Sequence, residues 1–368
     1  MLANGTTGSL SSHATGQRNT TVRPRLRKDG ISTRKADHIR ICLEEPVQGQ
    51  VTTGLEDWRL SHEALPEVDP RQIDLSVPLL GRVLRSPFFI SAMTGGTEEA
   101  AAINRNLAVA AEELGLAMVL GSQRPAIDEP ALASTYRVRP WAPSALLFAN
   151  LGAVQLNRGY GLDECRRAVD MVSADGLVLH LNPLQELLQP EGDRDFRGLV
   201  DKIAAVVEGL GCPVLVKEVG WGLSESSARR LRTVGVTLLD VAGAGGTSWS
   251  TVEGFRAADE AGKRAAAAFA DWGIPTAQSI RETRRGAPDA FVVASGGIRT
   301  GVEAAKAIAL GADAVGFALP LLEPAVRSAE AVIEYLAETT QQLRLAATCT
   351  GSRRLSDLRL ALRPARSA

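Results

Sequence analysis

Short apolar runs alternate with helix-like stretches from Pro87 onwards, and eight such rounds follow one another. Each run is nearly continuous in apolar residues, which is the pattern of parallel strands covered on both faces. The predicted strands are Phe88–Ala92, Ala117–Leu120, Leu146–Asn150, Leu177–Leu181, Val214–Lys217, Leu238–Val241, Phe291–Ala294 and Ala314–Phe317. Eight strand–helix rounds over roughly 250 residues predict an α/β protein of the (β/α)8 TIM-barrel class.

The stretches between the strands carry start and stop signals of helices. Thr97 precedes two glutamates as an N-cap, and Gly115 ends that helix just before the second strand. Residues Val302–Leu310 end on Gly311 in the same way. A doubly wound open sheet is the alternative, but the first turn, Ala92–Thr97, lacks the G-x-G-x-x-G spacing that such a sheet usually carries. The pattern therefore favours the barrel.

The segments before the barrel differ in composition. Residues 1–30 are rich in Ser, Thr, Gly, Asn and Arg and lack the apolar run of a secretory signal, so we expect a disordered N-terminal extension. Residues 32–40 indicate a short helix with grouped basic side chains, and residues 41–85 a preface that caps the barrel bottom or forms a hairpin. We predict one domain over residues 31–368, with the barrel proper at about 86–340.

Composition excludes several classes of partner. The formal net charge of −1 gives no basic field for nucleic acid or an anionic membrane, although local basic clusters could bind a small anion. No apolar run approaches the ~20 residues of a membrane span. The four cysteines, Cys42, Cys165, Cys212 and Cys349, form no C-x-x-C pair, so neither a zinc site nor a disulfide framework is indicated. A reducing, cytoplasmic location fits this cysteine usage.

Four polar residues lie within a short span at the carboxyl end of the fourth strand. They are His180, Asn182, Gln185 and Glu186, and Pro183 keeps the strand from continuing. Each alone is consistent with a satisfied core histidine or a solvated loop, but together they favour a site, because barrel enzymes carry their chemistry at the carboxyl ends of strands. Six of the other seven strands also end in polar or glycine-rich stretches, namely Ala92–Gly96, Gly121–Arg124, Asn150, Lys217–Glu218, Ala242–Ser248 and Ser295–Gly301, and the eighth strand runs into Ala318–Leu319.

Three features of this rim indicate anionic ligands. Gly296 and Gly297 permit close approach of a ligand, and the helix that opens at Thr300 suits a phosphate, although a plain tight turn is the alternative. Lys217 ends an otherwise apolar strand and could offset negative charge on a cofactor, or pair with Glu218 or Asp240. Glu186 could bind Mg²⁺ together with substrate phosphates, but a single carboxylate is a weak metal signal.

Six stretches carry a family resemblance that extends from Arg34 to the Thr350–Gly351 region. The chain resembles the type 2 isopentenyl diphosphate isomerases, which are FMN-dependent barrel enzymes. The stretches are Arg34–Ile39, Ser91–Gly96, Gly121–Arg124, His180–Glu186, Ala242–Trp249 and Ser295–Arg299. The first and fourth of these are specific to that family, whereas Gly-Gly-Ile-Arg is shared by FMN barrels generally.

The resemblance implies a role for each matching residue. Substrate diphosphate would be held by Arg34 and Lys35, with Ser122, Gln123 and Arg124 assisting and His38 close by; Asn182 and Gln185 would face the substrate. Glu186 would bind Mg²⁺. The FMN ring and ribityl chain would contact Ala92, Met93, Thr94, Ser122, Asn150, Lys217 and Thr247, and the FMN phosphate Gly296, Gly297, Arg299, Ala318 and Leu319.

The same resemblance implies the reaction, the interconversion of isopentenyl and dimethylallyl diphosphate. Neither carbon is activated, so ordinary side-chain acids and bases are poorly matched in pKa. Reduced flavin, maintained by NADPH or NADH, would act as acid and base, Lys217 would stabilise its anionic form, and His180 and Gln185 would orient substrate or relay a proton. The residue that takes the allylic proton stays open. The resemblance also implies a homo-oligomer, a tetramer or octamer, in which residues Arg34–His38 could act across a subunit interface.

Two other functions compete with this interpretation. An FMN-dependent 2-hydroxy-acid oxidase needs a histidine near the later glycine-rich loop, and none follows His180. An enzyme like inosine monophosphate dehydrogenase needs a cysteine after the sixth strand, and Gly243–Trp249 contains none. A non-catalytic flavin- or phosphate-binding protein would lack polar rim residues, but Arg34, Gln185 and Lys217 are present. The sequence therefore favours the isomerase.

Overall fold

A computed structural model describes residues 30–365 and has eight parallel strands closed into a barrel. The barrel strands are β4 (Phe88–Ile90), β5 (Ala117–Val119), β6 (Leu146–Gly152), β7 (Gly176–His180), β8 (Val214–Lys217), β9 (Leu238–Asp240), β10 (Phe291–Ala294) and β11 (Ala314–Phe317). Closure occurs where β11 pairs with β4, with Val315 opposite Phe88 and Phe317 opposite Ile90. The predicted fold class is confirmed, and the eight predicted strands differ from the observed ones by at most two residues at either end.

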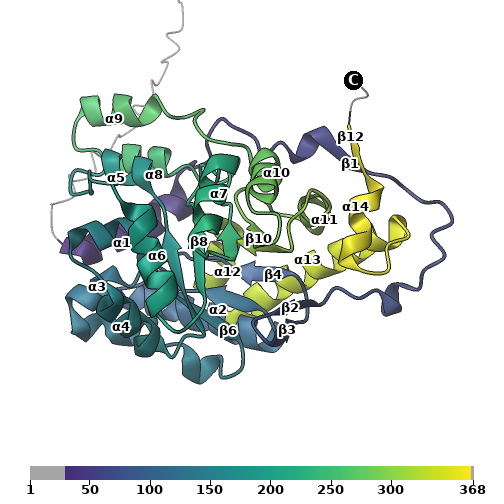
Figure 1. Cartoon of the computed structure of the whole chain (residues 1–368), viewed down its shortest axis with the longest axis horizontal. Coiled ribbons are helices and arrows are strands. Elements are labelled where there is room, and N and C mark those ends of the chain that lie inside the picture. The colour runs from purple at the N-terminus through teal and green to yellow at the C-terminus, as the bar shows by residue number, and fades with distance from the viewer. Residues whose placement is uncertain (1–29, 366–368) are drawn as a thin grey trace, which may run out of the picture.

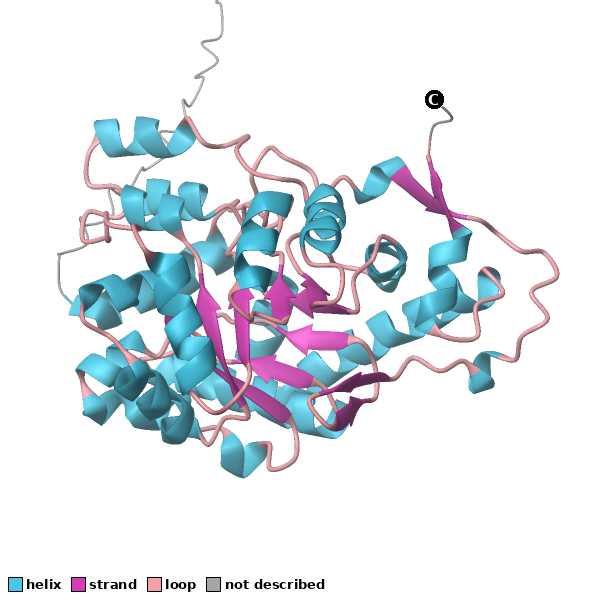
Figure 2. Ribbon diagram, viewed as in Figure 1, coloured by secondary structure: helices cyan, strands magenta, loops and turns pink. Residues whose placement is uncertain are grey.

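Helices surround the barrel, as Figures 1 and 2 show. Those between the strands are α2 (Glu98–Leu114), α3 (Arg124–Asp128), α4 (Leu162–Val172), α5 (Pro183–Leu188), α6 (Leu199–Gly209), α7 (Glu225–Thr233), α8 (Trp249–Arg256), α9 (Glu260–Ala267), α10 (Thr276–Gly286) and α11 (Gly301–Ala309). After the last strand come α12 (Leu319–Arg327), α13 (Ala329–Cys349) and α14 (Leu358–Ala361). Short 3-10 turns are η1 (Leu55–Asp57), η2 (Pro70–Gln72), η3 (Pro130–Tyr136), η4 (Arg139–Trp141), η5 (Ala153–Arg158) and η6 (Leu355–Asp357).

The predicted helix signals are present in the structure. The Thr97 side chain accepts a hydrogen bond from the Ala100 N–H, and Gly115 ends α2 in the left-handed conformation at φ 63°. Thr300 caps α11 in a reciprocal arrangement with Glu303, but that helix ends at Ala309, one residue earlier than predicted. These local contacts satisfy main-chain groups that a helix leaves unpaired at its ends.

The segments before the barrel have two functions in the fold. Helix α1 (Gly30–Glu44) is longer than the predicted basic helix and packs against α8 and α12. Strands β2 (Val77–Leu79) and β3 (Arg82–Leu84) form a hairpin whose apolar side chains join Phe89 and Phe148 inside the barrel. The hairpin therefore covers the barrel bottom, so the two alternatives expected for residues 41–85 occur together in residues 77–84. Apart from Gly30, the predicted disordered extension lies outside the described residues.

Chain segments far apart in sequence meet beside the barrel. Strand β1 (Trp58–Leu60) pairs antiparallel with β12 (Leu362–Pro364), and the Arg281 guanidinium lies over the Trp58 ring at 5.2 Å from its centroid. Figure 1 shows this pair and α14 at the side of the molecule opposite α5 and α9. The sequence pattern did not predict this sheet, because each strand is only three residues long. No helix in the described part of the chain is long and apolar enough to cross a membrane.

Two similar arginine–aspartate pairs lie at the amino-terminal ends of barrel strands. Asp175, just before β7, accepts hydrogen bonds from Leu147 N at 2.9 Å and Arg139 at 2.8 Å. Asp313, just before β11, accepts hydrogen bonds from Val292 N at 2.9 Å and an arginine, Arg284, at 2.7 Å. The strands involved are the third and fourth and the seventh and eighth of the barrel, so the two contacts stand half a barrel apart.

We predict that Asp175→Ala lowers the free energy of unfolding by about 2–3 kcal/mol, because Leu147 N and two arginines, Arg82 and Arg139, lose their acceptor. Chemical denaturation measures the change. Asp163→Ala is the matched control, since Asp163 has only an exposed pairing with Arg166. Equal stability of the two variants would contradict the structural role of Asp175.

Candidate active site

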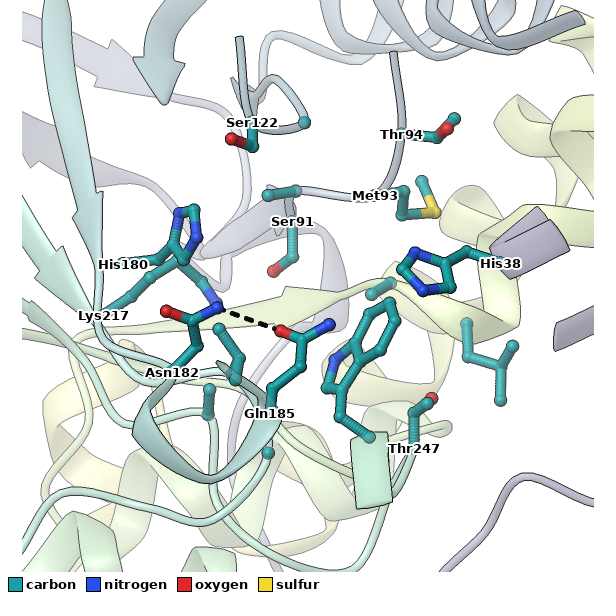
Figure 3. A pocket seen from close by; sticks show the side chains of 18 of the residues that line it. His38, Ser91, Met93, Thr94, Ser122, His180, Asn182, Gln185, Lys217 and Thr247 are labelled. Carbon is teal, nitrogen blue, oxygen red and sulfur yellow. Dashed lines mark hydrogen bonds between the residues drawn. The ribbon is translucent and has the colours of Figure 1, made fainter. Parts of the chain in front are cut away.

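A pocket opens at the rim formed by the carboxyl ends of the barrel strands. It is lined by every residue predicted for the site except Gln123, and therefore by Arg34, Lys35, His38, Ala92, Met93, Thr94, Ser122, Arg124, Asn150, His180, Asn182, Gln185, Glu186, Lys217, Thr247, Gly296, Gly297, Arg299, Ala318 and Leu319. Figure 3 shows His180 and Lys217 on one side of this pocket and His38 on the other. The structure thus brings together residues that are spread over most of the chain.

Gln123 has a different place from the one predicted. Its side chain is fully buried and donates to Ala168 O at 2.8 Å. Its Oε1 accepts from Asn150 N at 2.9 Å, and the Asn150 side chain in turn donates to Leu120 O. Gln123 therefore supports Asn150 from behind and does not reach the pocket.

Basic side chains gather on one face of α1. Arg34, Lys35 and His38 line the pocket at helical spacing, and Arg124 lies near Arg34. Burial, together with the neighbouring charge of Arg34, lowers the pKa of Lys35 to about 8. Arg34 contacts Gln189 Oε1 at 3.3 Å and Glu191 at 3.6 Å. A cluster of this kind suits a ligand with several anionic oxygens, because guanidinium and ammonium donors bind phosphates strongly.

One buried carboxylate, Glu253 on α8, connects the two sides of the pocket. Its Oε1 accepts from Gln189 at 2.6 Å and from Gln185 at 3.2 Å, and it also contacts His38 Nε2 at 3.1 Å. Its Oε2 accepts from Arg256 at 2.6 Å. Burial alone would raise the pKa of Glu253, but the hydrogen bond with His38 and the charge of Arg256 lower it to about 2. Glu253 is therefore an anion that fixes side chains from α1 and α5.

Sequence reasoning missed both Glu253 and Gln189. Glu253 lies four residues after Trp249, inside the helix that follows a predicted cofactor loop, which was the available signal. That signal was weak, because a glutamate in the middle of a short helix is ordinarily a solvent-exposed residue. Gln189 was visible only as one more polar residue after Glu186.

The ring of His180 has a defined orientation. Its Nδ1 lies 2.8 Å from Asn150 Oδ1, and Asn150 uses its amide N–H₂ on Leu120 O. Burial and the charge of Lys217 lower the pKa of His180 to about 3. The ring is therefore neutral near pH 7, with Nδ1–H donating to Asn150 and a lone pair on Nε2. A neutral imidazole of this kind is no strong acid.

Lys217 does not form an ion pair with Glu218 or Asp240, the two partners that the sequence suggested, in the described residues. Its Nζ donates to the main-chain oxygen of Glu218, whose carboxylate accepts four main-chain N–H groups of residues 219–222. The Asp240 carboxylate accepts from Ser295 Oγ at 2.6 Å and from Ala242 N at 3.2 Å. Because neither acid forms an ion pair with Lys217 in the described residues, the ammonium group is available to a ligand.

The carboxyl ends of the first, sixth and seventh barrel strands fit a flavin nucleotide. Gly296 and Gly297 have φ angles of 103° and 77°, and a Cβ at Gly246 would lie 2.5 Å from Gly297 N. Side chains cannot be added here, so the main chain of these glycines borders the pocket, which suits the close approach of a phosphate. Ser91 Oγ and Thr94 Oγ1 are buried without a partner in the described residues and belong to pocket-lining residues. Unpaired hydroxyls of this kind suit polar groups of a bound cofactor.

The carboxylate of Glu186 fits a metal that is shared with a ligand. Its Oε1 accepts from Asn182 Nδ2 at 3.0 Å and its Oε2 from Asp193 N at 2.8 Å. Asn182 Oδ1 is buried and has no partner among the described residues. No group of three or more His, Cys, Asp or Glu side chains that could hold a metal occurs in residues 30–365. A hard cation such as Mg²⁺ would therefore need oxygens from its substrate, as is usual for this ion.

Comparisons with known proteins agree with this geometry. The profile of the FMN-dependent dehydrogenase family matches residues 184–363. Among solved structures, a flavocytochrome b2 variant superposes with a TM-score of 0.66 at 17% identity and covers 90% of this chain and 85% of its own. A mandelate oxidase variant gives a TM-score of 0.63 at 17% identity, covering 92% and 100%. At these identities the likeness shows the fold alone, that of FMN-dependent (β/α)8 barrels.

Close relatives are known by one enzyme name. An isopentenyl-diphosphate delta-isomerase from Nostoc is 52% identical over 342 residues, which cover 92% of this chain and 97% of the relative. A protein of the same name from Synechocystis is 53% identical over 331 residues, covering 90% and 95%, and one from Rickettsia bellii is 46% identical over 328 residues, covering 89% and 96%. The chain belongs to the isopentenyl-diphosphate delta-isomerase family.

We predict that Glu253→Gln lowers kcat/KM by about 100-fold while FMN stays bound, because a misplaced pocket side chain costs about that much in rate. The change removes the charge that holds Gln185, Gln189 and His38. Steady-state kinetics and flavin absorbance measure the two quantities. Glu260→Gln is the control, since Glu260 pairs only with Lys263 on the surface of α9. Activity of Glu253→Gln equal to that of the control would contradict the role of Glu253.

Proposed function

We propose that this protein interconverts isopentenyl and dimethylallyl diphosphate by proton transfer that depends on reduced FMN and Mg²⁺. The observation that carries the proposal is one pocket that combines a cationic face on α1 with a glycine-lined rim that fits a flavin nucleotide. Membership of the isomerase family supports the same substrate pair. The reaction is isoprenoid chemistry without net oxidation or reduction.

The cationic residues bind the diphosphate. Arg34, Lys35 and Arg124 supply charge-assisted donors, and Ser122 lies near them at the same rim. Glu186, and with it Asn182, would hold Mg²⁺ against the diphosphate oxygens. His38 has its Nε2 on Glu253 and so fixes the wall beside the substrate. Gln123 assists through Asn150, because its own side chain does not reach the pocket.

The rest of the pocket rim is the proposed binding site of the cofactor, and the hydrocarbon end of the substrate must lie beside that cofactor to react. Bound FMN would have its ring and ribityl chain next to Ala92, Met93, Thr94, Ser122, Asn150, Lys217 and Thr247, and its phosphate next to Gly296, Gly297, Arg299, Ala318 and Leu319. These residues all line the pocket. Reduced FMN, kept reduced by NADPH or NADH, supplies the acid–base chemistry when it is bound. The ammonium of Lys217, which donates to a main-chain oxygen and forms no ion pair in the described residues, favours an anionic partner at the strand end.

The protein groups hold the substrate and exclude competing chemistry. Gln185 donates to Glu253 and accepts from Asn182 at 3.2 Å, so its amide is held at the pocket wall (Figure 3). Neutral His180 can accept a proton at Nε2 but is not itself protonated near pH 7. We therefore assign Gln185 and His180 to substrate orientation and proton relay, and Lys217 to electrostatic stabilisation.

The assembly and location of the protein are further parts of the proposal. We propose a homo-oligomer, a tetramer or octamer, because Leu187 and Phe255 expose apolar side chains on α5 and α8 next to the pocket. In Figure 1 these two helices lie together with α9. A cytoplasmic location is supported by four free cysteines, Cys42, Cys165, Cys212 and Cys349.

The proposed function predicts a specific isotopic result. Protein with FMN, NADPH and Mg²⁺ is incubated anaerobically with isopentenyl diphosphate in D₂O, and products are followed by NMR. We expect dimethylallyl diphosphate with incorporated deuterium and no stoichiometric consumption of NADPH. Absence of product from protein that carries reduced FMN would refute the substrate assignment. Stoichiometric NADPH oxidation coupled to turnover would refute the proton-transfer mechanism.

We predict an alkaline loss of substrate capture that is caused by Lys35. The pKa of Lys35 is lowered to about 8, so its ammonium form, which binds the diphosphate, is lost as pH rises through that value. The ratio kcat/KM should therefore fall above about pH 8, whereas kcat should change little, because bound diphosphate keeps Lys35 protonated. Lys35→Arg should remove this alkaline limb. An unchanged pH profile in that variant would contradict the assignment.

A further inference from the structure

The segment that follows α5 folds directly onto Glu186. Asp193 is only 3% exposed, and its main-chain N–H donates to Glu186 Oε2 at 2.8 Å. A Cβ at Gly192 would lie 1.8 Å from the main-chain oxygen of Glu186, so the segment packs against the helix backbone without room for a side chain. The main-chain donor of Asp193 is therefore held against the carboxylate by close packing.

The side chain of Asp193 fastens this segment to a second element. Its Oδ2 accepts from Gln155 Nε2 at 3.0 Å, and its Oδ1 accepts from Arg158 Nε. Both partners belong to η5, which follows β6, whereas Asp193 follows β7 and α5. One buried carboxylate thus connects the loops after two neighbouring strands.

The positions of two pocket residues, Glu186 and Arg34, depend on where this segment lies. Glu186 receives one donor on each oxygen, Asn182 Nδ2 and Asp193 N, which fixes the plane of its carboxylate. An ionised carboxylate has about four lone-pair positions, so two remain for a ligand in the pocket that Glu186 lines. The same segment carries Gln189 and Glu191, which contact Arg34.

We propose that Asp193 is the positioning residue of the Mg²⁺ site. It holds the segment whose N–H orients Glu186, and its bonds to Gln155 and Arg158 keep that segment in place. The inference rests on the proposed role of Glu186 and adds a residue that never contacts the metal. Partners that orient a metal-binding group typically change metal affinity by 10–100-fold when they are removed.

The test is calorimetric titration of Mg²⁺ into FMN-loaded protein that is saturated with inorganic pyrophosphate. Asp193→Asn keeps the size of the side chain but removes its charge, and we expect the Mg²⁺ dissociation constant to rise by about tenfold or more. FMN affinity and the thermal midpoint should stay near those of the unmodified protein. Asp195→Asn is the matched control, because Asp195 is in the same loop and pairs only with exposed Arg197.

A second variant keeps the test decisive if Asp193→Asn folds poorly. Arg158→Gln leaves Asp193 in place and removes one of its two side-chain partners; Arg158 is half exposed, so its loss should leave folding intact. We expect Mg²⁺ affinity to be weakened in this variant, by less than in Asp193→Asn. If Asp193→Asn does not retain FMN, the result for Arg158→Gln alone decides.

Failure of the metal assignment and failure of the positioning role give different results. The metal part of the proposed function is wrong if the unmodified protein binds no Mg²⁺. It is also wrong if Glu186→Gln binds Mg²⁺ as well as the unmodified protein does. If Mg²⁺ binding depends on Glu186 but is equal in Asp193→Asn, Arg158→Gln and the control, the positioning role is wrong. An equal loss of Mg²⁺ affinity, FMN affinity and thermal stability in Arg158→Gln would also overturn it, since that is the effect of general loosening.

Discussion

Closure of the barrel between β11 and β4 is the constraint on which the site depends. The pairing of Val315 with Phe88 and of Phe317 with Ile90 completes a ring in which all eight strands run in the same direction. Parallel strands in a closed ring bring their carboxyl ends to one rim, so residues from Ala92 to Leu319 share a pocket without being neighbours in sequence. The β2–β3 hairpin covers the opposite end, and the helix α1 adds cationic side chains to the rim.

Burial of charged groups then determines what each side chain can do. Glu253 is kept ionised by donors from three directions, whereas His180 is kept neutral by burial and the charge of Lys217. Lys217 forms no ion pair in the described residues, because Glu218 and Asp240 use their carboxylates on other groups. The pocket therefore has fixed charges for a diphosphate and a cofactor, and its one strand-end histidine, His180, is neutral near pH 7. That combination is what a cofactor-based proton transfer requires.

The sequence alone predicted the barrel and most pocket residues, because both depend on local patterns. Apolar runs such as Val214–Lys217 mark strands, and the residue that follows each run must lie at the rim. Thr97 and Gly115 fixed the ends of α2 through cap chemistry that spans a few residues. Gln123, in contrast, lies next to pocket residues in sequence but points into the protein, which spacing could not reveal.

Contacts between distant segments were not predictable. Glu253 is hydrogen-bonded to His38, which is 215 residues away in the sequence, and to Gln185, which is 68 residues away. Nothing in the local sequence of α8 specifies either partner. Asp193 depends in the same way on Gln155 and Arg158, and β1 pairs with β12 near the other end of the chain. Such pairs follow from the topology, so they become visible only when the barrel is assembled.

The most direct test of the account concerns the protonation of His180. The protein is labelled with ¹⁵N-histidine, the His180 signal is assigned by its loss in His180→Gln, and ring nitrogen shifts are followed from pH 5 to 8 in FMN-loaded protein. The account predicts a neutral ring throughout, with the proton on Nδ1, because the pKa of His180 is lowered to about 3. A ring that becomes imidazolium near pH 6.5 would make His180 an available acid and would contradict the assignment of proton transfer to the cofactor.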